Sequence, residues 1–450
     1  MRLKNSFLGY KHIHFVGIGG IGMSSLAKLC LNMGIKVSGS DKVKSHITEE
    51  LIHLGANVFY KHQKTNIFGA DLVVYTCAVG DKNIEVCYAL KNGIDVLERA
   101  DFLGEVAKCY KNVIAISGSH GKTTVCGMLC KIFETAGKKP TMIVGGEIGK
   151  NSNLVIGEKE FLIVEACEYK EHFLKIGHTI GAVLNIDYDH PDYFKTQIEY
   201  QDAFKRFAEQ SKDAVFSDEK YSILLGGKII TFGSNGKYQA KRVRHTDNKI
   251  KFDVYKDAVF YEAITLNCIG VHNAKNALCA IAIADYFGVA KGVIKQGLFE
   301  FENAKRRYEY MGKVNNNLVI TDYAHHPTQI KNVIGSTRQV YRKPVTVVFE
   351  PHTYSRTKYL FAEFVNALSL ADNIMLLPTY SAREKSQRGG TSRDLFNALC
   401  FKKQKVYFVK SYKKCQKELE KLKDNVILIL GAGSVIKLAE TIRKNFLQNR

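Results

Sequence analysis

Short apolar runs alternate with longer amphipathic segments over most of the chain, and this pattern predicts strands alternating with helices. In the first part of the chain the runs that predict strands are 12–16, 37–40, 72–76 and 95–97. In the last part they are 318–321, 345–349, 374–377, 406–409 and 426–430. Because strands that alternate with helices form parallel sheets with right-handed crossovers, we expect an α/β fold in both parts.

The middle of the chain predicts a sheet of mixed direction. Its apolar strands are expected at 112–116, 161–166 and 180–186, and a helix is expected to open at Thr124. The stretch 228–266 shows the alternation of exposed and buried positions that is typical of strands, with a turn at 234–236. This part therefore combines parallel and hairpin-type strands.

Length and composition bound the organisation of the chain. Its 450 residues have room for about three domains, which we place at 1–110, 111–312 and 313–450. Hydrophobic residues make up 46% of the sequence, enough for a sizeable core. The formal net charge is +21, but lysines and arginines are spread along the whole chain. Spread charge favours a solvated surface with basic clefts for acidic substrates over a nucleic-acid-binding tail.

Cysteine usage and the absence of long apolar segments bear on the compartment. The eleven cysteines stand at uneven intervals without a C-x-x-C pair, which indicates a reducing compartment with neither disulfides nor a zinc site. Residues 1–5 lead to the first strand without an apolar signal region, and no run of 18 apolar residues occurs. We expect a soluble, cytoplasmic protein that binds no membrane.

The segment from Ser117 to Thr124, read as Ser-Gly-Ser-His-Gly-Lys-Thr-Thr, forms a glycine loop between a predicted strand and a predicted helix. Such a loop directs backbone N–H groups at an anion, while Lys122 adds a point charge and Thr123 a hydroxyl for a cation. The usual phosphate-loop spacing would need glycine at position 116, which is Ile116. An ordinary glycine turn is the alternative, but it has no use for Lys-Thr-Thr, so we favour a nucleotide triphosphate.

A second glycine loop, Gly17-Ile18-Gly19-Gly20-Ile21-Gly22, follows the first predicted strand. Asp41 ends the next strand, at the distance where a Rossmann unit places an acid against a ribose hydroxyl. Taken alone, this unit predicts a nicotinamide or flavin cofactor, and Asp41 is equally well explained as a solvated turn residue. Together with the glycine loop at 117–124, it predicts two phosphorylated ligands on two domains.

Polar residues follow other predicted strands, at the edge where ligands gather in α/β sheets. Glu165 ends a strand, where a carboxylate can reach Mg²⁺ beside the triphosphate, and Glu168 lies three residues further. His190 follows the next strand, but a lone histidine is more often structural than a ligand. Three later clusters, 270–276, 305–309 and 322–327, are explained either as nucleotide contacts or as a helix cap, solvated charge and a turn.

The order of these motifs and the residues in them resemble those of the Mur ligases. The segments that carry the resemblance run through the whole chain: 17–24, 118–124, 165–169, 185–194, 272–276, 305–309, 322–327 and 351–357. Segments 165–169 and 189–194 are similar to the Gram-positive form of those members that add L-alanine to UDP-N-acetylmuramate.

The resemblance implies a fold and a reaction. The fold is α/β in three domains: N-terminal Rossmann-like, central P-loop ATPase with a mixed sheet, and C-terminal Rossmann-like. The reaction uses ATP and Mg²⁺ to convert the lactyl carboxylate of UDP-N-acetylmuramate into an acyl phosphate, which L-alanine attacks. The resemblance implies no nucleic-acid partner and a monomer or weak homodimer.

The resemblance also implies roles for individual residues. It places ATP against Gly118, Ser119, His120, Gly121, Lys122, Thr123, Thr124, Asn273, Asn276, Arg307 and Asp322. It places the UDP-sugar against Gly17, Gly19, Gly20, Gly22, Met23, Ser24 and Asp41. The implied Mg²⁺ ligands are Thr123, Glu165 and His190. The implied catalytic residues are Lys122, His190, His325, His352 and Arg356.

Other functions share part of this pattern. A ligase that joins a whole tripeptide to the same UDP-sugar, or a folylpolyglutamate synthetase, would have the same ATP-binding motifs. A nicotinamide-dependent oxidoreductase would use the first glycine loop and leave Lys122, Thr123 and Glu165 without a role. A basic nucleic-acid-binding protein fits the net charge, but the aromatic and basic motifs of the known modules are missing from the sequence.

Overall fold

A computed structural model describes residues 7–149, 152–246, 249–382 and 384–448. The expectation about residues 1–5 lies outside this range. The chain forms two compact units: the first comprises Met1–Ile186, Gln201–Gln239 and Ala277–Phe301, and the second comprises Asp187–Tyr200, Ala240–Asn276 and Glu302–Arg450. None of the helices in the described ranges is long and apolar enough to cross a membrane.

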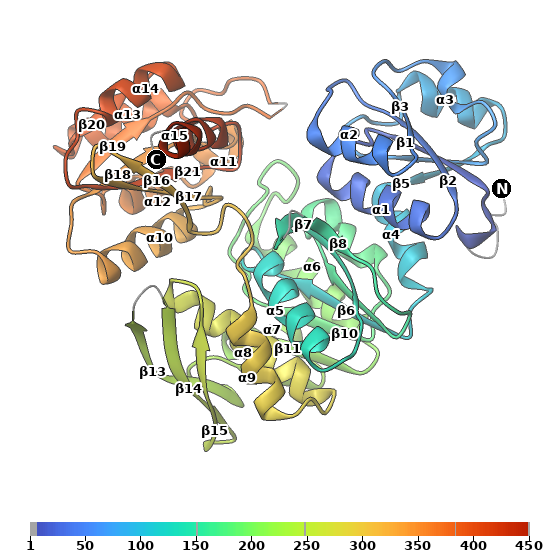
Figure 1. Cartoon of the computed structure of the whole chain (residues 1–450), viewed down its shortest axis with the longest axis horizontal. Helices are drawn as coiled ribbons and strands as arrows, with labels where there is room; N and C mark the ends of the chain where they lie inside the picture. Colours follow the sequence, from blue (N-terminus) through green and yellow to red (C-terminus); the bar gives the residue numbers. More distant parts are fainter. Residues whose placement is uncertain (1–6, 150–151, 247–248, 383, 449–450) are drawn as a thin grey trace. The chain divides into compact units, whose positions relative to one another are not determined.

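The first sheet of the first unit is fully parallel, with the order β3-β2-β1-β4-β5 (blue in Figure 1). Its strands are β1 (His12–Val16), β2 (Lys36–Ser40), β3 (Asn57–Phe59), β4 (Leu72–Tyr75) and β5 (Asp95–Glu98). The helices of this part are α1 (Ile21–Asn32), α2 (His46–His53), α3 (Ile84–Lys91) and α4 (Arg99–Ala107), with short turns η1 (Phe7–Gly9) and η2 (Lys64–Ile67). The four predicted strands are confirmed, and β3 is an additional one. Because the order reverses at β1, the loops after β1 and β4 lie at a topological switch point, where ligands bind in such sheets.

The second sheet of the first unit has the order β13-β12-β11-β10-β6-β9-β7-β8. Its strands are β6 (Asn112–Ser117), β7 (Thr141–Ile148), β8 (Ser152–Val155), β9 (Phe161–Glu165), β10 (Ile180–Val183), β11 (Ala214–Asp218), β12 (Ile229–Phe232) and β13 (Tyr238–Thr246), which continues into the second unit. The β7–β8 pair is antiparallel whereas β9, β6, β10 and β11 are parallel, so the predicted mixed sheet is confirmed.

The helices of this part are α5 (Lys122–Thr135), α6 (Gln197–Glu209), α7 (Ser222–Leu225), α8 (Val271–Tyr286) and α9 (Lys291–Glu300), with the turns η3 (Tyr169–Lys175) and η4 (Glu219–Tyr221). Helices α6 and α8 begin in residues of the second unit. Two predicted boundaries were wrong. Helix α5 begins at Lys122, two residues before Thr124, because Gly121 adopts a left-handed conformation (φ 87°) and caps the helix. Strand β10 ends at Val183, three residues before Ile186, because the chain turns there toward the glycine loop after β6.

The second unit contains a six-stranded sheet of order β16-β17-β21-β18-β19-β20 (orange to red in Figure 1). The strands are β16 (Glu309–Val314), β17 (Asn317–Asp322), β18 (Val345–Phe349), β19 (Asn373–Leu376), β20 (Val406–Phe408) and β21 (Val426–Leu430), and only the β16–β17 pair is antiparallel among those described. The helices are α10 (Pro327–Val340), α11 (Tyr354–Tyr359), α12 (Phe361–Leu368), α13 (Ser392–Phe401), α14 (Tyr412–Leu419) and α15 (Ile436–Gln448). An antiparallel hairpin of β14 (Lys249–Lys256) and β15 (Val259–Leu266) belongs to this unit as well.

The apolar runs form strands because both faces of the parallel sheets are covered. Every residue of β18 and β21 is buried, and helices contribute to the core clusters on the two faces of this sheet. Such strands are apolar throughout and do not alternate. Burial of one Val, Leu or Ile side chain stabilises the fold by about 1.5–3 kcal/mol.

A buried polar network lies within the first sheet and has no counterpart in the sequence predictions. The fully buried carboxylate of Glu85, at the start of α3, accepts hydrogen bonds from Ser40 Oγ (2.6 Å) and Asn66 Nδ2 (2.6 Å), and lies 2.9 Å from His62 Nδ1. The Nε2 atom of His14 lies 3.8 Å from the same carboxylate. Burial alone would raise the pKa of Glu85, but these partners outweigh it and lower the pKa to about 2.

This network predicts a pH-dependent contribution to stability. The pKa of Glu85 falls from 4.5 to about 2, so its contribution is present above pH 4.5 and is lost as the pH falls toward 2. We expect Glu85→Gln to lower the free energy of unfolding at pH 7 by about 3 kcal/mol, and the gap to wild type to narrow below pH 4.5. Urea unfolding at several pH values measures this gap. The variant Glu49→Gln, at an exposed position, is the matched control. A difference in unfolding free energy between Glu85→Gln and wild type that is absent, or that does not change with pH, would contradict the lowered pKa of Glu85.

Candidate functional site

The loop between β6 and α5 has the geometry of a phosphate-binding loop. Gly118 and Gly121 both have positive φ values, 136° and 87°. A Cβ atom on Gly118 would lie 3.0 Å from Leu184 Cβ and 3.1 Å from the backbone nitrogen of Asn185, so the loop passes too close to the residues after β10 for a side chain. The backbone therefore turns sharply and starts the helix at Lys122, so that the first N–H groups of α5 are open at the loop.

The Lys122 ammonium is held inside this loop by a buried acid. Its Nζ atom donates to the carboxylate of Glu168 (2.8 Å) and also to the carbonyl of Gly118. Only 2% of the Glu168 side chain is exposed. Burial opposes the charge on Lys122, but the carboxylates of Glu168 and Glu165 outweigh it and raise the pKa of Lys122 above its usual value. The lysine therefore remains a cation, although it is largely buried.

Thr123 and Glu165 form the second feature of this loop. Thr123 Oγ1 donates to Glu165 Oε2 (2.8 Å), and the same oxygen accepts from the backbone N–H of Gly145 (2.9 Å). A hydroxyl and a carboxylate are hard oxygen donors, which Mg²⁺ prefers. These two predicted metal ligands are therefore adjacent, and their chemistry fits the predicted ion.

Asn185 fixes the loop and was not predicted to have a role of its own. Its Oδ1 atom accepts from the backbone N–H of His120 (2.8 Å), and its Nδ2 atom donates to the carbonyl of the same residue (3.0 Å). Its own carbonyl accepts from the N–H of Ser119 (3.3 Å). Thr124, by contrast, is 5% exposed and belongs to the buried side of α5.

The first glycine loop is tied to β2 and its following turn. The N–H group of Gly17 donates to the carbonyl of Ser40 (2.7 Å), and Gly17 has a φ of 86°. The N–H of Gly19 donates to Asp41 Oδ2 (2.9 Å), while Asp41 Oδ1 accepts from the N–H of Val43 (3.1 Å). The Asp41 carboxylate thus fixes the glycine loop to the turn after β2 through these two hydrogen bonds.

The other predicted residues of this loop are placed differently. Met23 and Ser24 are buried, and their N–H groups bond to the carbonyl of Gly20, so both residues belong to the first turn of α1. A Cβ atom on Gly22 would lie 3.6 Å from Arg99 Nη1. Arg99, at the start of α4, is therefore a basic residue beside the loop that the sequence reasoning missed.

In the second unit a buried ion pair organises the predicted catalytic residues. The Asp189 carboxylate binds the Arg356 guanidinium through two contacts, Oδ1 to Nε (2.7 Å) and Oδ2 to Nη2 (3.3 Å). The Nη1 atom of Arg356 lies 3.1 Å from His352 Nδ1 and donates to the carbonyl of His352. Burial opposes both charges, but the pairing lowers the pKa of Asp189 and raises that of Arg356.

The predicted histidines lie around this pair. His190 has a left-handed backbone (φ 60°), and its Nε2 atom is 3.9 Å from Asp189 Oδ2. The rings of His325 and His352 have centroids 5.9 Å apart. Burial and the Arg356 charge lower the pKa of His352 to about 4 and hold that of His325 well below its usual value. Both rings are therefore neutral at pH 7.

Two of the predicted nucleotide contacts in this unit are paired with each other. The Nδ2 atom of Asn276 donates to Asn273 Oδ1 (3.0 Å), and Asn273 Nδ2 donates to the carbonyl of Ile269 (2.8 Å). Asn273 is 4% exposed, so this pair forms the N-terminal turn of α8.

The last two predicted nucleotide contacts are Asp322, which directly precedes Tyr323, and Arg307, whose guanidinium lies near the Tyr323 ring. Asp322 accepts from the N–H groups of Tyr308 and Ala324, at 2.8 Å each, and the Arg307 guanidinium lies 5.4 Å from the centre of the Tyr323 ring. Burial raises the pKa of Asp322, although the positive charge of Arg307 acts to lower it.

Comparison with known proteins places this geometry in a family. Models of the Mur ligase family match the chain in succession: the catalytic domain at 12–111, the middle domain at 116–284 and the glutamate ligase domain at 306–433. The UDP-N-acetylmuramate–L-alanine ligase of Hydrogenobaculum sp. (strain Y04AAS1) is 39% identical, over 95% of this chain and 97% of its own. That of Clostridium tetani (strain Massachusetts / E88) is 40% identical, over 97% and 99%.

Solved structures agree with this assignment. The crystal structure of UDP-N-acetylmuramate-alanine ligase MurC from Thermotoga maritima matches with a TM-score of 0.84 and 27% identity, over 98% of this chain and all of that one. The murein peptide ligase of Psychrobacter arcticus 273-4, at 22% identity and a TM-score of 0.69, shares the fold. The chain belongs to the Mur ligase family.

Proposed function

We propose that the chain ligates L-alanine to the lactyl carboxylate of UDP-N-acetylmuramate, with conversion of ATP to ADP and phosphate, in peptidoglycan precursor synthesis. The observation that carries this proposal is the charged Lys122 held in a glycine loop beside Thr123 and Glu165. The full-length similarity to relatives named UDP-N-acetylmuramate–L-alanine ligase supports the choice of substrates. We assign the reaction to the cytoplasm, where ATP and the UDP-sugar are available.

The first step is phosphoryl transfer to a carboxylate, which resists direct attack by an amine. Lys122 and the first N–H groups of α5 bind the β- and γ-phosphates and stabilise the charge that spreads over the transferred group. The carboxylate of Glu168 holds Lys122 in its charged form. The triphosphate therefore meets a lysine that is oriented and protonated before it binds.

Thr123 and Glu165 hold Mg²⁺ in this proposal, and His190 contributes to a second metal position. When bound, Mg²⁺ neutralises the charge on the phosphate oxygens. The loop from Gly17 to Gly22, braced by Asp41, holds the diphosphate of the UDP-sugar. Around ATP, we assign Asn273 and Asn276 to the adenine and Arg307 and Asp322 to the phosphate and ribose.

The second step is attack of the neutral amine of L-alanine on the acyl phosphate, with loss of phosphate from a tetrahedral intermediate. His325 and His352 are neutral at pH 7, so each can accept a proton or a hydrogen bond from the incoming amine. Arg356 is the permanent charge of this group and holds His352 in place through its Nη1 atom. Exclusion of water protects the acyl phosphate during this step.

The test of this function is phosphate release from ATP with UDP-N-acetylmuramate, with and without L-alanine. We expect sustained release only when both substrates are present, together with formation of the alanyl product. Offering the tripeptide or a folate substrate instead separates the related ligases. Reduction of a nicotinamide cofactor without ATP turnover would contradict the proposal and favour an oxidoreductase.

Lys122→Ala is expected to reduce ligation at least about 100-fold, because loss of one such contact to the transferred phosphoryl group costs about 3 kcal/mol. The rate of ADP formation measures this loss. The variant Lys122→Ala with Glu168→Gln also removes the buried charge left behind, and should show the same defect with a folded circular dichroism spectrum. Lys139→Ala, whose lysine pairs with Glu158 on the surface, is the matched control. Near wild-type activity of the Lys122 variants would refute the assignment.

Arg356→Lys is expected to raise the KM for L-alanine roughly ten- to hundredfold, because lysine keeps the charge but loses the two-point contact with Asp189 and the support of His352. The KM values for ATP and the UDP-sugar should change little. Steady-state kinetics with each substrate varied in turn tests this split. The exposed Arg338→Lys serves as control, and a uniform rise in all three KM values would indicate a merely structural role.

A further inference from the structure

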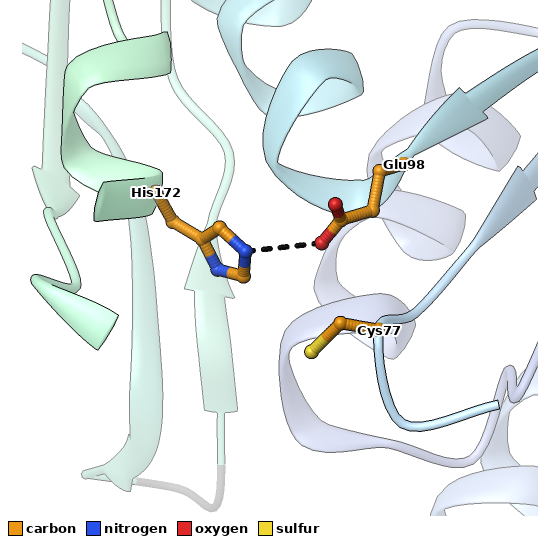
Figure 2. Close-up of side chains that lie close together, drawn as sticks. All are labelled: Cys77, Glu98 and His172. Carbon is orange, nitrogen blue, oxygen red and sulfur yellow. Dashed lines mark ion pairs between the residues drawn. The ribbon is translucent and has the colours of Figure 1, made fainter. Parts of the chain in front are cut away.

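Three potential metal ligands converge in the first unit, at positions far apart in the sequence. Cys77 follows β4, Glu98 ends β5 and His172 lies in η3. One ligand atom from each lies within 4.8 Å of the other two. Figure 2 shows the imidazole of His172 and the carboxylate of Glu98 facing one another, with the thiol of Cys77 beside them. Because β4 and β5 are adjacent parallel strands, their ends bring Cys77 and Glu98 together.

The contacts of these side chains leave ligand atoms available. Oε1 of Glu98 is buried and makes no hydrogen bond within the described residues, and His172 Nε2 lies 3.0 Å from it without the alignment of a hydrogen bond. Cys77 is a free, half-buried cysteine, and its thiol forms no hydrogen bond in the described part of the chain. The contact with His172, drawn as a dashed line in Figure 2, is an ion pair only if the ring is protonated. A buried carboxylate oxygen without a hydrogen bond is costly, and a cation bound between Glu98 and His172 would satisfy it.

The donor types select the class of ion. A thiolate, an imidazole and a carboxylate are the ligands of zinc and similar divalent metals, whereas Mg²⁺ prefers oxygen alone. This set therefore differs from the oxygen pair of Thr123 and Glu165. Three protein ligands leave a fourth position of a tetrahedral ion for water or an anion.

We propose that Cys77, Glu98 and His172 form a binding site for one zinc-class divalent cation. The sequence argued against a zinc site because no C-x-x-C pair occurs, but the fold assembles this one from three separate segments. The proposal does not depend on the ligase reaction.

The surroundings make the thiolate essential to this site. The Arg99 guanidinium lies 3.5 Å from His172 Nδ1, so a cation at Nε2 approaches a fixed positive charge. The negative charges of the Cys77 thiolate and the Glu98 carboxylate offset this repulsion. Loss of the thiol should therefore abolish binding.

The site also borders the first glycine loop. Thr76, next to Cys77, reaches within 2.8 Å of the position of a Cβ on Gly17, and Arg99, next to Glu98, lies 3.6 Å from that on Gly22. A bound ion would tie the loop after β4 and the start of α4 to η3. Since the ligands come together only in the folded chain, the ion should stabilise the native state.

Co²⁺ is the probe, because a cobalt–thiolate bond gives a charge-transfer absorption band that oxygen and nitrogen ligands do not. We expect the full-length, reduced and metal-free protein to bind one Co²⁺ with this band, Zn²⁺ to displace it, and Zn²⁺ to raise the melting temperature. Cys77→Ser should lose the band. His172→Gln should weaken Co²⁺ binding by at least about tenfold, because removing even a residue that only hydrogen-bonds to a metal ligand has an effect of this size. Cys87→Ser and Cys400→Ser are the matched controls and should keep the band.

The absence of a band in wild type, or its persistence in Cys77→Ser, would overturn the proposal. Unchanged affinity in His172→Gln would do the same. Circular dichroism and the melting temperature of each metal-free variant establish that it is folded. If Cys77→Ser proves unfolded, Glu98→Gln replaces it, and wild-type affinity in that variant and in His172→Gln would equally exclude the site.

Discussion

The ion pair between Lys122 and Glu168 is the contact on which the candidate site depends. A buried lysine keeps its charge only beside a buried carboxylate, and Glu168 supplies one from the segment after β9. The pair holds the lysine over the glycine loop, while Asn185 latches the loop to the end of β10. In the reaction we propose, the triphosphate competes with Glu168 for the same ammonium group. Because these contacts fix both the loop and the charged lysine, the loop is preorganised to bind an anion.

The strands of the three sheets could largely be predicted, because fully buried parallel strands are continuous apolar runs. Strands β3, β7, β8, β11 and β16 were missed, and two of them have a clear physical reason. Strand β3 (Asn57–Phe59) has only three residues and is partly exposed, so it carries no apolar run. Strand β7 (Thr141–Ile148) contains Gly145 and Gly146, and its pairing with β8 is irregular there. Helix α5 begins earlier than expected because Gly121 adopts a left-handed conformation and caps the helix, and the sequence alone does not show this conformation. The domain boundaries stay predictions.

The site could be predicted only as far as local motifs reach. The spacing after β6 identified Lys122 and Thr123, and the end of β9 identified Glu165, since strand ends and helix starts are local features. The ion-pair partners could not be predicted from local motifs, because Glu168 is 46 residues from Lys122 and Asp189 is 167 residues from Arg356. Such pairs exist only once the sheets have formed. Family resemblance singled out His325, His352 and Arg356, and the structure adds the acid that organises them.

The most direct test of the account follows one oxygen atom. If the lactyl carboxylate of UDP-N-acetylmuramate becomes an acyl phosphate before L-alanine attacks, one carboxylate oxygen must leave with the phosphate. With the carboxylate labelled with oxygen-18, mass spectrometry of the released phosphate should show one labelled oxygen for each amide bond formed. Unlabelled phosphate accompanying product formation would contradict the mechanism and the purpose we assign to the Lys122 loop.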